Sequence, residues 1–401
     1  MPALVLGIDT PIGLSIIREL GQHGVPVTGI GRSAHALGMA SRYLQRGVVR
    51  ADDSAALIEQ LVALGRELGP ACLFAISESD ITLLNQHRAR LSGFTLMFTD
   101  EARMARVLNK EQTYAAAARV GIRVPRTEQV TSLAAAQQVA PQLRYPVVLK
   151  WANPNDVVDV LIAAGCEQDK THYCYSAAEL LAYLQPYAKV GLFPLIQEYC
   201  AGFGLGQFVL MKDGVAHAIF QHKRLHEWPP EGGFSSQCES LPQAANGALM
   251  ERSVALLREL DWEGIAMVEY RYDPATAEAA LMEINGRFWG SLPLAYHAGA
   301  QFPWLLYQLF GQQRAVTQPA YRAGVRCRFM IPETKRLLRI LFQQSRIADR
   351  NVSFARAPAL LGYLADFVRP GSRYYIFEWK DARPFFSDIA NIVAGLFKRR
   401  E

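Results

Sequence analysis

Short apolar runs alternate with amphipathic stretches over roughly the first hundred residues. Apolar runs at residues 3–8, 25–30, 71–76 and 95–98 predict buried strands, and helical spacing marks residues 12–20 and 54–68 and the stretches that begin at 81 and 100. Strands that alternate with helices pair in parallel, and helices cover both faces of the sheet. The pattern therefore predicts an α/β domain with a doubly wound parallel sheet.

The pattern changes after residue 108, where hairpins replace this alternation. An alanine-rich helix opens at Lys110, a buried strand ends at Lys150, and a glycine-rich stretch at residues 202–206 leads into a long hairpin that turns at residues 212–214. A helix at residues 244–260, a second hairpin at residues 266–287 and a helix at residues 292–310 follow. Antiparallel hairpins predict a second, α+β architecture, and the pattern after Pro319 is too irregular to assign.

The second hairpin carries acidic residues in a specific register. If its turn is centred near Thr276, Glu269 lies opposite Glu283, and like charges so placed repel unless a positive group lies between them. Asn285 and Arg287 extend the same face, because side chains two apart on a strand point to one side. Mg²⁺ prefers one or two carboxylates, an amide or water oxygen and phosphate oxygens, so this row suits a metal that carries a nucleotide. Arg287 can then meet the phosphates with its planar guanidinium group.

The alternative is a surface hairpin with solvated acids and a simple Asn-Gly turn. However, Glu269 follows Met267-Val268, and Glu283 lies between Met282 and Ile284. An unpaired charge within such apolar strand sequence is costly, which favours the metal site.

Two loops are further candidates for substrate binding. Ser77 and Glu78 follow a strand end, where they act either as a helix N-cap with an acidic first turn or on a substrate. Lys223 and Arg224 precede a glycine loop that contains Gly233, and they either hold an acidic substrate under this loop or are solvated charges. The first glycine turn, residues 7–13, lacks the G-x-G-x-x-G spacing and is interpreted as a tight turn.

Composition excludes several classes of protein. The 401 residues are 50% hydrophobic and carry a net charge of +5 without a basic tract, so nucleic acid is not an expected partner. The six cysteines are scattered without C-x-x-C spacing, which predicts buried thiols rather than disulfides or zinc. No apolar stretch reaches the length of a membrane span and no signal peptide is recognisable, so a cytoplasmic location is expected.

Basic residues are concentrated late in the chain. Residues 336–346 and 389–400 have the pattern of amphipathic basic helices. Either helix can lie on an acidic membrane surface or a partner, although packing against the protein's own core is favoured. A homodimer is left open.

In this order, the segments over residues 1–315 resemble the ATP-grasp superfamily of ADP-forming ligases. They are most similar to its carboxylate–amine ligase branch, which is related to biotin carboxylase, carbamoyl-phosphate synthase and D-alanine–D-alanine ligase. The segments that carry the resemblance are Asn109-Lys110, the strand Pro146 to Lys150, Gln197-Glu198-Tyr199, and Glu269 with Glu283-x-Asn285-x-Arg287. The resemblance implies an N-terminal domain at residues 1–108, a two-lobed ATP-grasp module with antiparallel sheets at 109–193 and 194–318, and a C-terminal extension at 319–401.

The resemblance also implies roles for individual residues. Lys110 and Lys150 would bind the phosphates of ATP, and Gln197, Glu198 and the backbone near Cys200 would recognise adenine. Glu269, Glu283 and Asn285 would bind Mg²⁺, for which Mn²⁺ can substitute, and Arg287 and Lys150 would act in catalysis. Independent physical reasons support two of these roles, because a lysine supplies a point charge for phosphate and glutamine can both donate to and accept from adenine.

Two features depart from the family pattern. Residues 151–156 replace the usual glycine-rich flap, and the ribose-binding glutamate is missing near residues 204–207. The hypothesis is an enzyme that joins a carboxylate to an amine through an acyl phosphate. The alternatives are a phosphotransferase, a carboxylase-type enzyme and a catalytically silent MgATP sensor.

Overall fold

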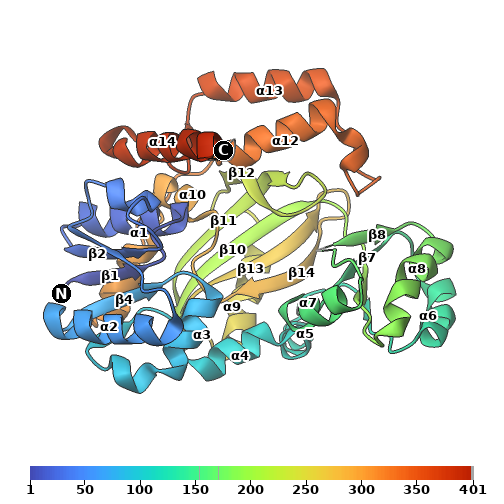
Figure 1. Cartoon of the computed structure of the whole chain (residues 1–401), viewed down its shortest axis with the longest axis horizontal. Helices are drawn as coiled ribbons and strands as arrows, with labels where there is room; N and C mark the ends of the chain where they lie inside the picture. Colours follow the sequence, from blue (N-terminus) through green and yellow to red (C-terminus); the bar gives the residue numbers. More distant parts are fainter. Residues whose placement is uncertain (153, 170, 399–401) are drawn as a thin grey trace.

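The computed structural model of the protein describes residues 1–152, 154–169 and 171–398. Within them, the strands form sheets of five, four and seven strands (Figure 1). Figure 1 shows the five-stranded sheet at one end, the large sheet in the middle and the four-stranded sheet in a lobe at the other end. Among these residues no helix is both long and apolar enough to cross a membrane.

The five-stranded sheet has the order β3-β2-β1-β4-β5, and every pairing in it is parallel. Its strands are β1 (Ala3–Leu6), β2 (Val27–Gly31), β3 (Arg46–Val49), β4 (Ala71–Ala75) and β5 (Phe94–Leu96), and its helices are α1 (Pro11–Gln22), α2 (Ser54–Leu68), α3 (Glu78–Gln86) and α4 (Glu101–Leu108). The predicted doubly wound parallel sheet is confirmed. Edge strand β3 was not predicted, because it is largely exposed and carries no apolar run.

Local side chains explain where these helices begin. Thr10, Asp53, Ser77 and Asp100 are the N-caps of α1 to α4, and each side chain accepts a hydrogen bond from a backbone N–H three residues on. The first glycine turn is tight, as the sequence predicts. A Cβ atom on Gly13 would lie 2.7 Å from the Gly7 carbonyl oxygen, and Gly7 has a φ of +103°.

The four-stranded sheet forms the small lobe and has the order β6-β9-β7-β8. Its strands are β6 (Thr127–Glu128), β7 (Val147–Lys150), β8 (His172–Cys174) and β9 (Leu195–Glu198), which all pair antiparallel, and its helices are α6 (Leu133–Val139), α7 (Pro154–Ala163) and α8 (Ala177–Leu184). Helix α5 (Lys110–Arg119) leads into this lobe. Helix α7 begins at Pro154, in the stretch that replaces a glycine-rich flap; Asn153 of that stretch lies outside the described residues.

The large sheet has the order β14-β13-β10-β11-β12-β15-β16. Its strands are β10 (Phe203–Lys212), β11 (Val215–Trp228), β12 (Phe234–Ser240), β13 (Gly264–Asp273), β14 (Glu278–Asn285), β15 (Arg326–Arg328) and β16 (Ser372–Tyr374). The helices in this part of the chain are α9 (Gly247–Glu259), α10 (Leu292–Ala298), α11 (Phe302–Leu306), α12 (Met330–Phe342), α13 (Arg356–Val368) and α14 (Arg383–Lys398). The single helix predicted over residues 292–310 is wrong, because Gly299, with a φ of 85°, ends α10.

The segment after Pro319, which the sequence left unassigned, completes the large sheet and contacts the N-terminal one. Strands β15 and β16 extend the sheet from β12. Arg18 of α1 is 1% exposed, and its Nε atom lies 3.0 Å from Asp381 Oδ2. Asp381 also accepts a hydrogen bond from Ser41. A buried ion pair with these further hydrogen bonds fixes the C-terminal segment against α1.

Helix α1 also provides a test of the fold. Burial raises the pKa of Glu19 from its ordinary value of 4.5 to about 8, although the Trp304 amide donates to its carboxyl group. Because the folded protein keeps this proton while the unfolded chain loses it, the free energy of unfolding should fall between pH 4.5 and pH 8, by about 3–5 kcal/mol from this group.

Glu19→Gln should remove this part of the pH dependence, since the amide is neutral and its oxygen still accepts from Trp304. Urea unfolding at pH 5 and pH 8 measures the difference. Glu67→Gln, at an exposed glutamate, is the matched control and should retain the wild-type slope. An equal slope for Glu19→Gln and wild type would show that Glu19 is ionised in the folded protein.

Candidate functional site

The hairpin of β13 and β14 places the two acidic residues opposite each other. Glu269 pairs directly with Glu283, as the sequence predicts. The turn alone would not give this register. Asp273 pairs with Glu278 and Tyr270 with Leu281, so an unbroken ladder would place Met282 opposite Glu269. A β-bulge at Met282 then shifts β14 by one residue, and only this shift brings Glu283 opposite Glu269.

Glu283 begins a polar row on one side of β14. Asn285 Nδ2 donates to Glu283 Oε1 at 3.0 Å, which confirms that both side chains lie on the same side. Glu283 is exposed, whereas Asn285 is buried. No cationic side chain among the described residues forms an ion pair with Glu283, so its carboxylate is open to a ligand from solution.

Arg287 lies beyond the end of β14 and meets the N-terminal domain. Its Nε atom is 3.0 Å from Glu78 Oε1, and its Nη1 donates to the Phe288 carbonyl oxygen at 3.2 Å. Glu78 belongs to the first turn of α3. Of the two candidates in that loop, Ser77 is the N-cap of α3, and Glu78 is the residue that reaches Arg287 beyond the end of β14.

Arg224 of β11 supplies a positive charge beside Glu269. Its Nη2 atom lies 2.5 Å from Glu269 Oε2, and Nη1 donates to the Gly233 carbonyl oxygen at 2.9 Å. Burial raises the pKa of Glu269 above its ordinary value; the charge of Arg224 opposes this shift and that of Glu283 adds to it. The positive group that the sequence assigned to a metal is therefore supplied in part by the protein.

Two glycines of β10 make room for this arrangement. A Cβ atom at Gly204 would lie 2.5 Å from Arg224 Cδ, and one at Gly206 would lie 2.8 Å from His222 Nε2. The side chains of Arg224 and His222 on β11 therefore occupy the space that a side chain at Gly204 or Gly206 would fill. This gives the glycine-rich stretch at residues 202–206 a structural reason.

The two predicted phosphate-binding lysines come from different elements. Lys150 ends β7, and Lys110 is the first residue of α5. Burial lowers the pKa of Lys150, and the positive charge of Lys110 lowers it further, whereas Glu283 and Glu269 act to raise it. Lys150 is therefore within electrostatic reach of the other three charges. Two half-buried lysines that lie near each other repel unless an anion lies between them.

Gln197 lies beside Lys150 but is already engaged by the protein. Its Oε1 atom accepts from Lys150 Nζ at 3.5 Å, and its Nε2 atom donates to Tyr114 and Thr127 hydroxyl oxygens at 3.3 and 3.1 Å. The contacts orient Lys150. Recognition of adenine by the Gln197 side chain stays a prediction.

The remaining residues predicted to recognise adenine contact Arg123. Glu198 forms an ion pair with Arg123 and also accepts from the Arg126 amide at 3.0 Å. Cys200 Sγ lies 3.6 Å from Arg123 Nη1, and burial raises the pKa of this thiol. Because successive side chains of a strand alternate, Glu198 points away from the side of the sheet on which Gln197 contacts Lys150 of β7.

Lys223 does not join the group around Glu269. Its Nζ atom lies 3.0 Å from Glu239 Oε1 on β12, whereas Arg224 points to the opposite side of β11. Of the residues predicted to hold an acidic substrate, Arg224 contacts Glu269 of the hairpin with its side chain. The carbonyl oxygen of Gly233 accepts a hydrogen bond from Arg224, whereas Lys223 pairs with Glu239.

His222 also lies beside this site, although the sequence assigned it no role there. It is 1% exposed, its Nδ1 atom lies 3.1 Å from Ser291 Oγ, and its Nε2 atom has no hydrogen-bond partner among the described residues. Burial holds the pKa of His222 well below its ordinary value, and the charge of Arg224 acts in the same direction. The signal was its spacing of two from Arg224, which puts both side chains on one side of β11.

The donor set suits magnesium. Among the described residues, no three His, Cys, Asp or Glu side chains are grouped so that they could hold a metal ion by themselves. A site made of Glu269, Glu283 and the Asn285 amide therefore needs phosphate or water oxygens to complete it. Mg²⁺ has this preference for few protein ligands, whereas structural zinc sites need four.

Comparison with known proteins identifies the fold. Residues 235–330 match the family model described as ATP-grasp in the biosynthetic pathway with Ter operon. L-amino acid ligase from Bacillus licheniformis superposes with a TM-score of 0.56 and 17% identity, over 77% of this chain and 74% of that one. The chain has the ATP-grasp fold. No curated protein matches it by sequence.

Two further ATP-grasp structures were determined as nucleotide complexes. Biotin carboxylase from Campylobacter jejuni, in a β-γ-ATP complex, superposes with a TM-score of 0.61 and 13% identity, over 81% of this chain and 74% of that one. The biotin carboxylase domain of Hydrogenobacter thermophilus 2-oxoglutarate carboxylase, with MgADP and bicarbonate, gives 0.60 and 15%, over 81% and 73%. The family match covers β12 to β15 and so includes the hairpin and Arg287.

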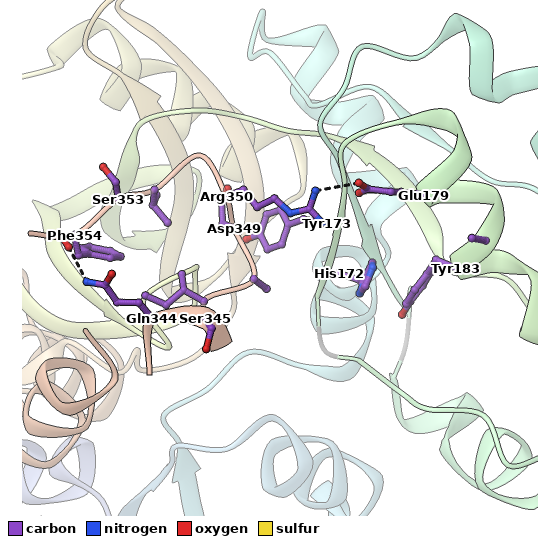
Figure 2. Close-up of a pocket in the computed structure, with 14 residues that line it drawn as sticks. His172, Tyr173, Glu179, Tyr183, Gln344, Ser345, Asp349, Arg350, Ser353 and Phe354 are labelled. Carbon is purple, nitrogen blue, oxygen red and sulfur yellow. Dashed lines mark hydrogen bonds and ion pairs between the residues drawn. The ribbon is translucent and has the colours of Figure 1, made fainter. Parts of the chain in front are cut away.

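A large pocket of the protein lies away from these residues. Its volume is about 890 Å³, and it lies between the small lobe and the segment after α12 (Figure 2). Figure 2 shows His172, Glu179 and Tyr183 on one wall and Ser345, Arg350 and Phe354 among the residues facing them, with an ion pair of 3.0 Å between Arg350 and Glu179. None of the predicted site residues lines it.

Proposed function

We propose that this protein is an ATP-dependent, ADP-forming ligase that joins a carboxylate to an amine through an acyl phosphate. The observation that carries the proposal is that Lys150, at the end of β7, lies within electrostatic reach of Lys110 and of the facing pair Glu269 and Glu283 on β13 and β14. Two cations and two carboxylates close together are the arrangement expected for a triphosphate and its divalent metal.

Each residue has a role in this proposal. Glu269, Glu283 and Asn285 would hold Mg²⁺, which when bound neutralises charge on the phosphates. Lys110 and Lys150 would bind the phosphate oxygens as point charges. Arg287 is oriented by Glu78 and the Phe288 carbonyl oxygen, so that its remaining nitrogen can bind the anionic acyl phosphate.

The reaction has two steps. A carboxylate oxygen of the acid attacks the γ-phosphorus of ATP, the bond to the β,γ-bridging oxygen breaks, and ADP leaves. The amine nitrogen then attacks the acyl carbon, phosphate leaves with the former carboxylate oxygen, and the nitrogen loses a proton to give the amide. Positioning and electrostatic stabilisation are enough for the first step, so no protein nucleophile is needed.

The similar structures support ATP chemistry but do not select the acceptor. The similar structures include an amino acid ligase and a biotin carboxylase domain in complex with MgADP and bicarbonate. A carboxylase-type reaction through carboxyphosphate is therefore the second candidate. Because ATP is the co-substrate in both, we infer that the protein works in the cytoplasm.

Release of ADP, measured against a matrix of acids and amines with MgATP, tests the proposal. We expect ADP and phosphate only when an acid and an amine are both present. A stable phosphorylated product without an amine would indicate a phosphotransferase, bicarbonate dependence would indicate a carboxylase, and nucleotide binding without turnover of any pair would indicate a sensor. Glu283→Gln, purified in parallel, controls for contaminating ATPases.

A further inference from the structure

Exposed apolar side chains are concentrated in the last part of the chain. Of the 20 large hydrophobic residues that are exposed among the described residues, 13 lie at or after Ile331. They lie on α12, α13 and α14 and the turn before α14, and these three helices line one side of the molecule, at the top of Figure 1. Monomeric soluble proteins rarely expose apolar residues in such a concentration without a binding role.

Exposed apolar residues of α13 lie along one side of the helix. Leu361, Leu364 and Val368 recur at helical spacing and are 66%, 53% and 83% exposed. On the opposite side of the helix Asp366 is buried and accepts a hydrogen bond from Gln237. The helix therefore packs on the protein with its polar side and presents an apolar stripe outwards.

Helix α14 and the turn before it continue the same feature. Phe386, Ile389 and Val393 form a stripe with spacings of three and four residues, and all are exposed. Trp379 in the preceding turn is 88% exposed. Aromatic residues of this kind are typical of the boundary between lipid headgroups and acyl chains.

In the same segment, basic residues outnumber acidic residues and are the ones that are exposed. Residues 330–401 contain 13 Lys and Arg against 7 Asp and Glu, whereas residues 1–329 contain 29 against 30. Among the described side chains at 330–394, eight basic residues and no acidic ones are exposed: Lys335, Arg346, Arg350, Arg356, Arg369, Arg373, Lys380 and Arg383. The acids Glu333, Asp349, Asp366 and Asp381 are all at most 4% exposed.

We propose that the outer side of α12, α13 and α14, with Trp379, is a docking surface for a membrane that contains anionic phospholipid. We call it the C-terminal face. Its apolar stripes would enter the headgroup region while the surrounding lysines and arginines contact the phosphates. A second copy of the chain fits less well, because a two-fold interface would press this basic face against itself. The sequence favoured packing of the helices at residues 336–346 and 389–400 against the core. Helix α12 does pack there with Leu337 and Ile340, but the stripe of α14 faces outwards.

Co-sedimentation with lipid vesicles tests the C-terminal face. The full chain should bind vesicles that contain about one third phosphatidylglycerol and bind pure phosphatidylcholine vesicles at least about tenfold more weakly. Trp379→Ser with Phe386→Ser should weaken binding at least about tenfold, since each large apolar side chain contributes to insertion. Lys380→Gln with Arg383→Gln should do the same and should reduce the salt dependence.

Matched controls separate the face from general surface effects. Ile162→Ser with Val215→Ser changes exposed apolar residues elsewhere, and Arg66→Gln with Lys189→Gln changes exposed charges elsewhere; both should bind vesicles like wild type. Unchanged melting temperatures would show that every variant is folded. Equal binding by face and control variants, or no binding by wild type, would overturn the proposal. A dimer in light scattering that Trp379→Ser with Phe386→Ser dissociates would assign the face to a second copy instead.

Discussion

Glu283→Gln is expected to lower ADP release at least about a hundredfold, because it removes the negative charge of a metal ligand while keeping its size. Glu283 is exposed and bonded to Asn285, and the amide can keep this contact, so the melting temperature should change little. Turnover with saturating Mg²⁺ and ATP measures the effect.

The control for this variant lies on the same strand. Glu278→Gln changes an exposed glutamate at the start of β14, far along the strand from Glu283, and should keep wild-type turnover. If Glu283→Gln also turned over ATP at a near-normal rate, the hairpin would not be the metal site. Loss of activity in both variants would point to damage to the hairpin rather than to loss of a ligand.

Lys150→Met is expected to weaken ATP binding about tenfold to a hundredfold, which corresponds to one charge-assisted hydrogen bond to phosphate. Methionine keeps the length of the side chain and removes its charge. Calorimetric titration with MgATP measures the change. Because burial and Lys110 lower the pKa of Lys150, wild-type affinity should fall as pH rises, starting below the ordinary lysine value of 10.5.

A lysine of the same lobe is the control. Lys189→Met replaces an exposed lysine that follows α8, and it should bind MgATP like wild type. The pH dependence gives a second criterion. The affinity of Lys189→Met for MgATP should fall as pH rises, like that of wild type, whereas the affinity of Lys150→Met should not. Equal affinity of Lys150→Met and wild type would remove Lys150 from the phosphate site.

The sequence identified the hairpin for a reason that is only partly correct. Symmetry about Thr276 placed Glu269 opposite Glu283, and the structure confirms the pair. The actual turn is centred half a residue earlier, and the bulge at Met282 corrects the register. Bulges depend on contacts beyond the hairpin, so no local pattern predicted this one.

The source of positive charge beside Glu269 was not predictable from the sequence. Arg224 is 45 residues away along the chain and reaches the carboxylate across β10 because Gly204 has no side chain. Recognising this pair required the strand order β13-β10-β11, which sequence periodicity does not specify. Arg224 was selected as a site residue, but as a substrate ligand.

The parallel sheet was predictable because its central strands are fully buried and read as apolar runs. The segment after Pro319 was not, since β15 and β16 are three residues each and carry arginines. Short strands at or next to the edge of a sheet depend on their neighbours more than on their own sequence. The same reasoning explains why edge strand β3 was missed.

The central claim is that Glu269 and Glu283 bind the divalent metal of a nucleotide held by Lys110 and Lys150. A crystal structure with Mn²⁺ and a non-hydrolysable ATP analogue, in which anomalous scattering locates the metal, tests this claim most directly. We predict a metal ion that is bound by both carboxylates and bridges to phosphates in contact with both lysines. A metal ion or nucleotide located away from the β13–β14 hairpin would contradict the account.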